Sequence, residues 1–245
     1  MELTGIQLLL FIVAAIAIGF SKTGVTGATL PAVALIACTF GAKQSSGIML
    51  TMLIIGDFLA VFNYGKYGKF KDVMRVLPPA LAGLLLGGVV GGFLNDAQFK
   101  FLLGIIISIC SVLLVCQEKS GKTIKVPDHP FYHVMVGILS GFSSMVGNAA
   151  GPIFSVYLLS LSFDKNKFMG TTSWFFLIVN LLKLPFLIFS WHTVNLGTVK
   201  YTVYMLPCIL IGALLGVYFI KKINERLFKM LVIIMTTLAA VRLLI

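Results

Sequence analysis

Residues 19–27 read GFSKTGVTG and interrupt an apolar run, and residues 141–152 read GFSSMVGNAAGP and interrupt another, 122 residues further along the chain. Each stretch precedes a short apolar segment that opens near a proline, Pro31 in the first case and Pro152 in the second. Hydrophobic segments interrupted by glycine at corresponding points of two halves are typical of transporters, whose substrate site lies between those halves. The two stretches therefore predict a duplicated fold and the position of a binding site.

The composition is that of a membrane protein. Hydrophobic residues make up 59% of the 245 residues and charged residues 11%, whereas soluble domains carry about 25% charged residues. Apolar runs recur along the whole chain, and a run of about 20 residues crosses a hydrocarbon core about 30 Å thick. Because lipid offers no partners to backbone groups, helices are the expected spanning elements. We therefore expect a single all-α, polytopic transmembrane domain over residues 1–245.

Ten apolar segments divide into two halves of five. They cover residues 6–20, 29–40, 46–63, 76–94 and 99–116, then 132–145, 152–162, 168–190, 201–220 and 227–245. Like residues recur between the halves at spacings of 123 and 129, as in the pairs Gly47 and Gly170, Asp57 and Asn180, Gly83 and Gly212, and Gly87 and Gly216. We expect a first repeat over residues 1–116, a cytoplasmic linker over 117–131 and a second repeat over 132–245.

The loop charges predict that the two repeats have inverted topology. Five segments is an odd number, so a second half that follows five reversals of the chain begins on the opposite side of the membrane. If the loop at 64–75 is cytoplasmic, the cytoplasmic loops hold 13 lysine and arginine residues and the opposite side holds four. That asymmetry agrees with the positive-inside rule and assigns both termini to the extracytoplasmic side. Lys22 and Lys183 belong to neither side.

The first two segments of each half are short. The 15 residues of segment 6–20 span about 22 Å as a helix, which is less than the hydrocarbon core. Each pair is expected to form a re-entrant hairpin or two broken, tilted helices. The prolines suit first helical turns, so the glycine-rich stretches are expected at helix N-termini, whose free N–H groups attract anions. The alternative is a pair of glycine kinks that only allow close helix packing.

Three ionisable residues, Lys22, Asp57 and Lys183, lie inside or beside apolar runs. A charged side chain near the bilayer centre costs about 2.5–3.5 kcal/mol on insertion scales, so it usually has a partner or a function. The alternative for each lysine is a stem that extends to the membrane surface. For Asp57, two interpretations remain open: a structural pair with a lysine, or a site for a coupling ion or proton.

Other classes of protein find no support in the sequence. It contains no HExxH, GxSxG or P-loop motif, so an enzyme is not expected. The four cysteines and three histidines form no metal-ligand pattern, so neither a metal nor a cofactor is expected. The net charge of +11 is spread over short loops and forms no basic stripe with exposed aromatic residues, which excludes a nucleic-acid partner.

With these motifs, the chain resembles the TauE/SafE family of sulfite and organosulfonate transporters. The likeness covers nearly the whole chain and rests on four motifs: GFSKTGVTG at 19–27, Gly56-Asp57-Phe58 followed by Tyr64, GFSSMVGNAAGP at 141–152, and TTSWFFLIVNLLKLPF at 171–186. The resemblance implies secondary transport of small sulfur-containing anions, often outward, across bacterial inner membranes. It carries Lys22, Asp57, Asn180 and Lys183 over as motif positions.

The leading hypothesis is a secondary transporter of small sulfur-containing anions that exports them by alternating access with ion or proton coupling; the alternative is a passive anion channel. The expected substrate-binding residues are Ser21, Lys22, Thr23, Gly24, Thr26, Gly27, Ser143, Ser144, Gly147, Asn148 and Gly151. The expected coupling or surrounding residues are Asp57, Asn180 and Lys183. The expected partners are a small inorganic or organic anion and the lipid bilayer, and a homodimer is left open.

Overall fold

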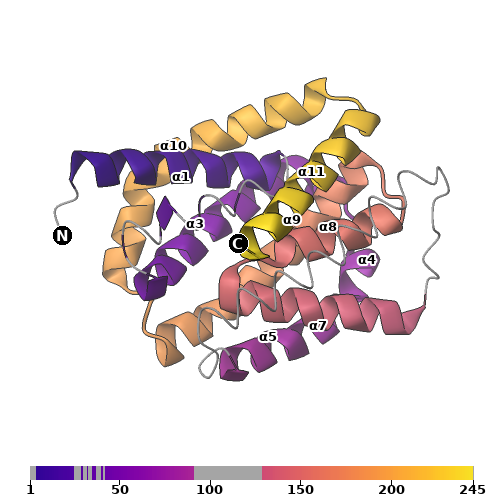
Figure 1. The fold of residues 1–245 in the computed structure, drawn as a ribbon, viewed down its shortest axis with the longest axis horizontal. Coiled ribbons are helices and arrows are strands. Elements are labelled where there is room, and N and C mark those ends of the chain that lie inside the picture. The colour runs from indigo at the N-terminus through magenta and orange to yellow at the C-terminus, as the bar shows by residue number, and fades with distance from the viewer. Residues whose placement is uncertain are drawn as a thin grey trace.

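A computed structural model describes residues 4–24, 42–90 and 129–244, together with residues 29, 32, 35, 36 and 40. All regular elements within these residues are helices (Figure 1). They are α1 (Gly5–Thr23), α3 (Ala42–Tyr64), the 3-10 turn η1 (Gly65–Tyr67), α4 (Phe70–Met74), α5 (Leu77–Val90), α7 (Pro130–Gly147), α8 (Ala150–Ser160), α9 (Lys165–Pro185), the π-helical turn η2 (Phe186–Ser190), α10 (Leu196–Lys222) and α11 (Glu225–Leu244).

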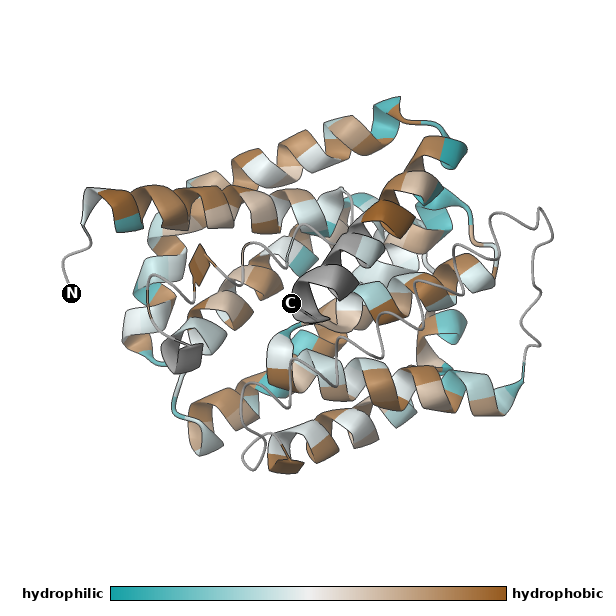
Figure 2. Ribbon diagram, in the orientation of Figure 1, coloured by the Kyte–Doolittle hydropathy of each residue, from teal (hydrophilic) through white to brown (hydrophobic). Residues whose placement is uncertain are grey.

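Four stretches of helix are long and apolar enough to cross a membrane: Gly5–Thr23, Ser45–Tyr67, Lys165–Ser190 and Leu196–Lys222. The helices α5 and α8 are shorter and also apolar. Figure 2 shows hydrophobic residues along the lengths of α1, α5 and α10. The expected all-α, polytopic membrane architecture is therefore confirmed. The expected segment 99–116 and nearly all of the linker at 117–131 lie outside the described residues.

Helix starts follow local capping signals. Thr4 and Gln7 form a capping box at the start of α1, and Asn195 and Thr198 form another at the start of α10. The carboxylate of Asp164 accepts hydrogen bonds from the N–H groups of Asn166 and Lys167 at the start of α9. Such caps supply acceptors to N–H groups that have no partner within the helix.

Glycines bring two pairs of helices into backbone contact. Gly19 of α1 lies against the backbone of Ile209 and Ala213 in α10, where a Cβ atom would collide with the Ile209 carbonyl oxygen. Gly141 of α7 lies in the same way against Ala80 and Leu84 in α5. Small residues permit this close packing inside membranes. The partners of the two glycines are 129 residues apart, a spacing at which like residues recur between the halves.

The helices form two outer pairs around a central crossing. In Figure 1, α1 and α10 run from left to right, whereas α5 and α7 run from right to left. Between these pairs, α3 packs against α9, α1 and α10. The helices α1 and α7, each of which contains one of the two Gly-Phe-Ser sequences, thus run in opposite directions.

The helices α7 and α8 form an antiparallel hairpin. The Tyr132 hydroxyl, near the start of α7, lies 3.0 Å from Ser160 Oγ at the end of α8. One turn earlier in α8, the Tyr157 hydroxyl lies 2.8 Å from Nδ1 of His133, the residue that follows Tyr132 in α7. The chain therefore reverses at its tip, Asn148 and Ala149, and returns toward the end from which it came.

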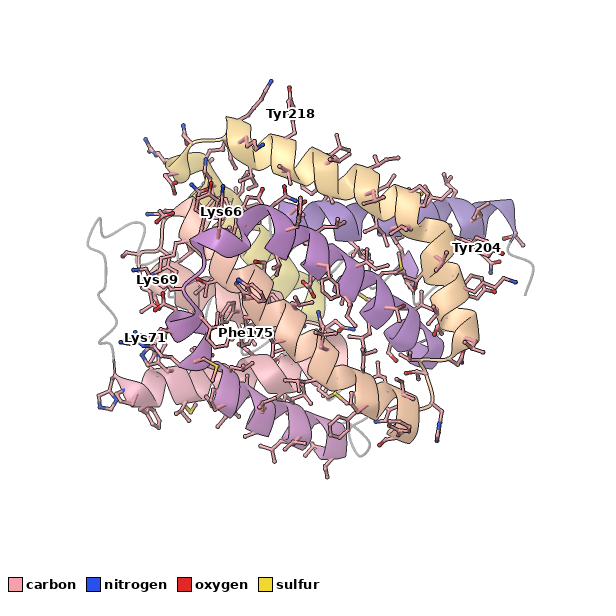
Figure 3. The ribbon with its side chains drawn as sticks, turned by 180° about the vertical axis from the view of Figure 1, so that it is seen from behind. Lys66, Lys69, Lys71, Phe175, Tyr204 and Tyr218 are labelled. Atoms are coloured by element: carbon pink, nitrogen blue, oxygen red, sulfur yellow. The ribbon has the colours of Figure 1, made fainter. Side chains whose placement is uncertain are left out.

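Several lysine-rich loops gather at one end of the molecule. Lys167 forms an ion pair with Asp72 of α4 at 2.9 Å. Lys165 Nζ donates to the carbonyl oxygens of Ile220 and Ile223 at the end of α10, at 3.1 and 2.7 Å. Figure 3 shows Lys66, Lys69 and Lys71 at this end and Tyr204 toward the other. Within the described residues, the loops at 64–75, 163–167 and 221–229, which the charge pattern assigned to the same side, therefore lie together.

Candidate functional site

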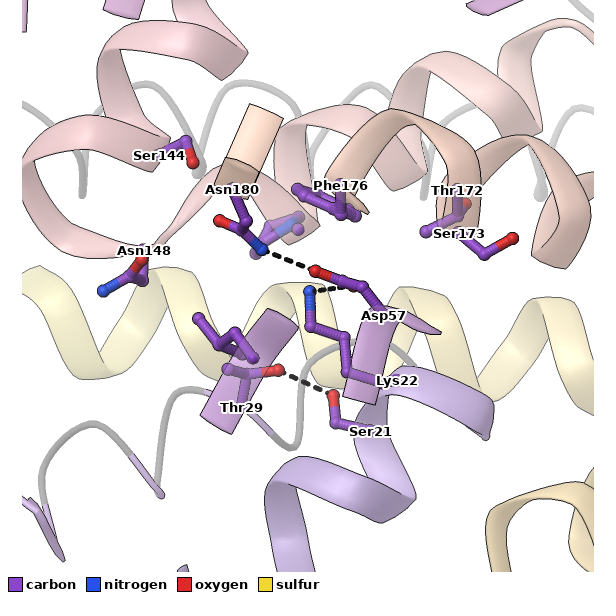
Figure 4. A pocket seen from close by; sticks show the side chains of 13 residues that line it. Ser21, Lys22, Thr29, Asp57, Ser144, Asn148, Thr172, Ser173, Phe176 and Asn180 are labelled. Carbon is purple, nitrogen blue, oxygen red and sulfur yellow. Dashed lines mark hydrogen bonds and ion pairs between the residues drawn. The ribbon is translucent and has the colours of Figure 1, made fainter. Parts of the chain in front are cut away.

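A cavity lies where α3 and α9 pass each other (Figure 4). Ser21 and Lys22 reach it from the end of α1, and Asp57 and Asn180 reach it from α3 and α9. The tip of the α7–α8 hairpin contributes Ser144, Asn148 and Gly151. Its volume is about 40 Å³, on a scale on which one water molecule takes about 10–15 Å³. The cavity therefore has room for a small ion.

Asp57 is the centre of the polar cluster in this cavity. Lys22 Nζ lies 2.7 Å from Asp57 Oδ1, and Asn180 Nδ2 donates to Asp57 Oδ2 at 2.6 Å. Both contacts converge on the carboxylate in Figure 4. Asp57 is fully buried, and the Lys22 side chain is 11% exposed. Lys22 Nζ also lies 4.6 Å from the centre of the Phe176 ring, which adds a cation–π contact.

Lys183 is buried behind one wall of the cavity. Its Nζ donates to the Ser144 carbonyl oxygen at 2.7 Å and to Asn148 Oδ1 at 2.5 Å. Asn148 ends α7 in the left-handed conformation with φ of 51°, and the lysine holds its side chain. The last carbonyl groups of a helix carry a partial negative charge, so the end of α7 favours an ammonium group. The alternative of a stem extended to the membrane surface is wrong for Lys183.

The helices α1 and α7 continue further into the glycine-rich stretches than the sequence predicts. Ser21, Lys22 and Thr23 lie in the last turn of α1, and Ser143, Ser144 and Gly147 lie in the last turns of α7. These side chains therefore belong to helix C-termini and not to a non-helical break, because both helices continue beyond the apolar run. Thr26 and Gly27 lie outside the described residues.

The second stretch does place a helix N-terminus at the cavity. The helix α8 begins at Ala150, and Pro152 lies in its first turn. The N–H groups of Ala150 and Gly151 have no acceptor within the helix, and Gly151 lines the cavity. The partial positive charge of this helix end is therefore directed to the place where an anion would bind.

The family model of the sulfite exporter TauE/SafE matches residues 9–243. The chain belongs to the TauE/SafE sulfite exporter family. A search of curated proteins and a search of solved structures each found no match. Membership of TauE/SafE, together with the apolar helices, makes the chain a multi-pass membrane protein of a family of sulfur-anion transporters.

Five of the described residues that were expected in the site do not line this cavity: Thr23, Gly24, Ser143, Gly147 and Lys183. Thr23 instead connects helices. Its hydroxyl donates to the Ala213 carbonyl oxygen at 2.7 Å, and its own carbonyl oxygen accepts from the Tyr64 hydroxyl at 2.9 Å. Ser143 Oγ is buried and meets no hydrogen-bond partner within the described part of the chain.

The cavity also has lining residues that were not expected: Thr29, Leu53, Pro152, Thr172, Ser173 and Phe176. The spacing of some of these residues in the sequence could have predicted that they belong to the site. Thr172, Phe176 and Asn180 follow one another at intervals of four, so they share one face of α9. Leu53 and Phe176 stand at the 123-residue spacing that relates Asp57 to Asn180.

The fixed charges of this site favour an anion. Among the described residues, two lysines lie at the cavity or behind its wall, Lys22 and Lys183, and one carboxylate, Asp57, pairs with Lys22. Hydroxyl groups of Ser144 and Thr172 line the same cavity, and so does Ser173, whose hydroxyl donates to the Gly170 carbonyl oxygen at 2.9 Å. Donors of this kind bind the oxygen atoms of an oxyanion.

Proposed function

We propose that this chain is a secondary transporter that exports small sulfur-containing anions, of the sulfite or organosulfonate class, by alternating access. The observation that carries the proposal is the polar cluster of Lys22, Asp57 and Asn180, which faces a cavity between apolar helices. Charged residues at such depth mark the pathway of a substrate or ion. Family membership supports a sulfur anion as the substrate.

The anion is bound at the tip of the α7–α8 hairpin and beside Lys22. Lys22 supplies an ammonium group, Ser21, Ser144 and Asn148 supply polar side chains, and Gly151 supplies a backbone N–H group at the start of α8. The cavity volume of about 40 Å³ favours a compact anion over a bulky one.

The transporter consists of two inverted repeats, at 1–116 and 132–245. Three observations support this proposal. Gly19 and Gly141 contact partners that differ by one constant spacing. The helices α1 and α7 run in opposite directions in Figure 1. Asp57 and Asn180 occupy matched positions and touch, as residues on a two-fold axis between repeats do.

The lysine-rich end of the molecule faces the cytoplasm, and both termini lie outside the plasma membrane. The support is the gathering of loops near Lys167, Asp72 and Lys165 at one end, combined with the positive-inside rule. Movement of one repeat against the other would then open the cavity to each side in turn.

Asp57 is the proposed coupling residue, and its ion pair with Lys22 favours a coupled transporter over a passive channel. A channel can use a fixed positive charge alone and has no need of a carboxylate on it.

A flux assay with purified protein in liposomes tests the function. Radiolabelled sulfite, sulfate, thiosulfate and taurine are offered with and without imposed pH and voltage gradients, and protein-free liposomes serve as the control. We expect uphill movement of at least one sulfur anion under a gradient. Flux that only follows the anion's own gradient makes the protein a channel, and no flux of any of these anions overturns the transport proposal.

A further inference from the structure

We infer that the Asp57 carboxylate binds Lys22 at the position that the transported anion would take, and that the anion binds Lys22 only when Asp57 takes up a proton. This inference rests on the proposed function and specifies the coupling ion as a proton. It begins from the two contacts of the carboxylate, which engage Lys22 Nζ at 2.7 Å and Asn180 Nδ2 at 2.6 Å.

The Asp57 carboxylate uses the donors that an oxyanion would need. Sulfite and sulfonates present oxygen atoms that accept from ammonium and amide N–H groups, as carboxylate oxygens do. Lys22 and Asn180 both line the cavity, and both of them bind Asp57. The carboxylate therefore acts as an internal competitor for the substrate.

The second lysine does not offer a free place for the anion. Lys183 is 1% exposed and does not line the cavity, and its ammonium group is held by Ser144 and Asn148. Its hydrogen-bond partners are neutral oxygen atoms, and no carboxylate among the described residues is bonded to it. Lys22 is therefore the lysine that an anion can reach.

Charge decides whether the anion and the carboxylate can share Lys22. Two negative groups at hydrogen-bond distance from one ammonium group repel each other strongly in a cavity with little water. Among the described residues, the charged groups that act on Asp57 are Lys22 from α1 and Lys183 from α9. Thr202 of α10 contacts Thr51 of α3 and carries no charge.

Protonation of Asp57 resolves the conflict. One O–H bond forms on the carboxyl group, no other bond changes, and Lys22 keeps its charge. The negative charge beside Lys22 is then removed, so the positive charge of Lys22 is left for an anion to neutralise. Each anion bound at Lys22 therefore brings one proton into the cavity.

Titration calorimetry of sulfite binding in detergent tests this step. Repeating the titration in buffers of different ionisation enthalpy measures the protons taken up per sulfite bound. The wild type is compared with Asp57→Asn, which keeps an acceptor for Lys22, and the proton exchange of sulfite itself cancels in the comparison. We expect the wild type to take up about one proton more per sulfite than Asp57→Asn, and the affinity of the wild type to fall as pH rises more steeply than that of the variant.

Asp72→Asn is the matched control, because Asp72 also forms an ion pair with a lysine, Lys167, but does not line the cavity. We expect its proton uptake to equal that of the wild type. Equal proton uptake in the wild type and Asp57→Asn overturns the inference. The inference is also overturned if the proton uptake of the wild type is no larger than the proton exchange of sulfite itself. This second measurement does not require a variant that folds. These outcomes leave the transport proposal intact, whereas absence of sulfite flux in liposomes contradicts that proposal.

Discussion

Lys22 and Asp57 are mutually dependent, because each would be a lone charge among apolar helices without the other. Removal of one partner of a buried ion pair costs about 3–5 kcal/mol, whereas neutralisation of both partners can be nearly free. The pair on its own is therefore weak evidence for stability. Because the pair lies on the wall of a cavity, a role in function explains it more directly than a role in stability.

The first prediction separates the folding role of this pair from its binding role. Lys22→Gln should lower the free energy of unfolding by about 3–5 kcal/mol, because Asp57 loses its cation, and should reduce sulfite affinity at least about tenfold. Lys22→Gln with Asp57→Asn should recover stability but not affinity, since the ammonium group is still missing. Thermal unfolding and sulfite binding in detergent measure the two effects.

Lys200→Gln serves as the control for this pair of variants, because Lys200 is exposed and does not line the cavity. If sulfite binds the double variant as tightly as the wild type, Lys22 is not part of the binding site.

The second prediction concerns Lys183. Lys183→Met keeps most of the side chain but leaves Asn148 Oδ1 without its donor, and the Ser144 carbonyl oxygen keeps only the N–H group of Asn148. Buried acceptors without partners cost about 1–3 kcal/mol, so unfolding should become easier by that amount. Sulfite affinity should also fall, since both residues form the cavity wall. Lys200→Met is the matched control, and a stability equal to that of the wild type would contradict the role given to Lys183.

At this scale the sequence revealed which residues matter better than it revealed their contacts. The matched spacing of Asp57 and Asn180 drew attention to both residues but did not predict that they touch. The contact of Lys183 with Asn148 had no such signal, since the residue 123 positions before Lys183, Ala60, carries no charge. Polar residues of α9 such as Thr172 were missed because hydroxyl groups inside a membrane helix can bind their own backbone.

At the scale of the helices, the closest packing depends on glycine. A third prediction follows from this packing. Gly19→Ala and Gly141→Ala should each lower the free energy of unfolding by about 1–3 kcal/mol, because a Cβ atom would meet backbone atoms of α10 or α5.

Gly5→Ala is the control for the helix-packing variants, since nothing lies within 4 Å of a Cβ atom at that position. It should be neutral or slightly stabilising, because alanine favours the helix more than glycine does. If all three variants unfold alike, close packing at Gly19 and Gly141 does not hold the helices together.

The positions of helices were easier to predict than their ends. Apolar runs located α3, α9 and α10 within a few residues. The single apolar segment expected at 168–190 is divided at Pro185, where α9 ends and the π-helical turn Phe186–Ser190 follows. The direction of α8 was open as well, because it depends on contacts such as that of Tyr132 with Ser160, which join residues far apart in sequence.

At the scale of the whole molecule, the proposed inversion of the two repeats has the clearest consequences. The fourth prediction uses Lys71 and Lys200, which are exposed, stand 129 residues apart and would be equivalent positions of the two proposed repeats. In a variant without native cysteines, Lys71→Cys should react with a membrane-impermeant thiol reagent only from the cytoplasmic side. Lys200→Cys should react only from the opposite side. Labelling of both from the same side would show that the repeats are not inverted.

Loop charge carried the topology further than any other property of the sequence. It grouped the loops near Asp72, Lys165 and Lys167, which the structure brings to one end. It could not supply the cavity, because a cavity depends on how four separate parts of the chain pack.

The most direct test of the central claim is to locate the anion itself. Selenite has the shape and charge of sulfite, and its selenium atom can be found by anomalous scattering in crystals of the protein. Competition with sulfite flux in liposomes first establishes that selenite uses the transport site. A selenium peak is expected in the cavity, with the oxygen atoms of selenite about 3 Å from Lys22 Nζ. A selenite ion that competes with sulfite but binds elsewhere in the protein would contradict it.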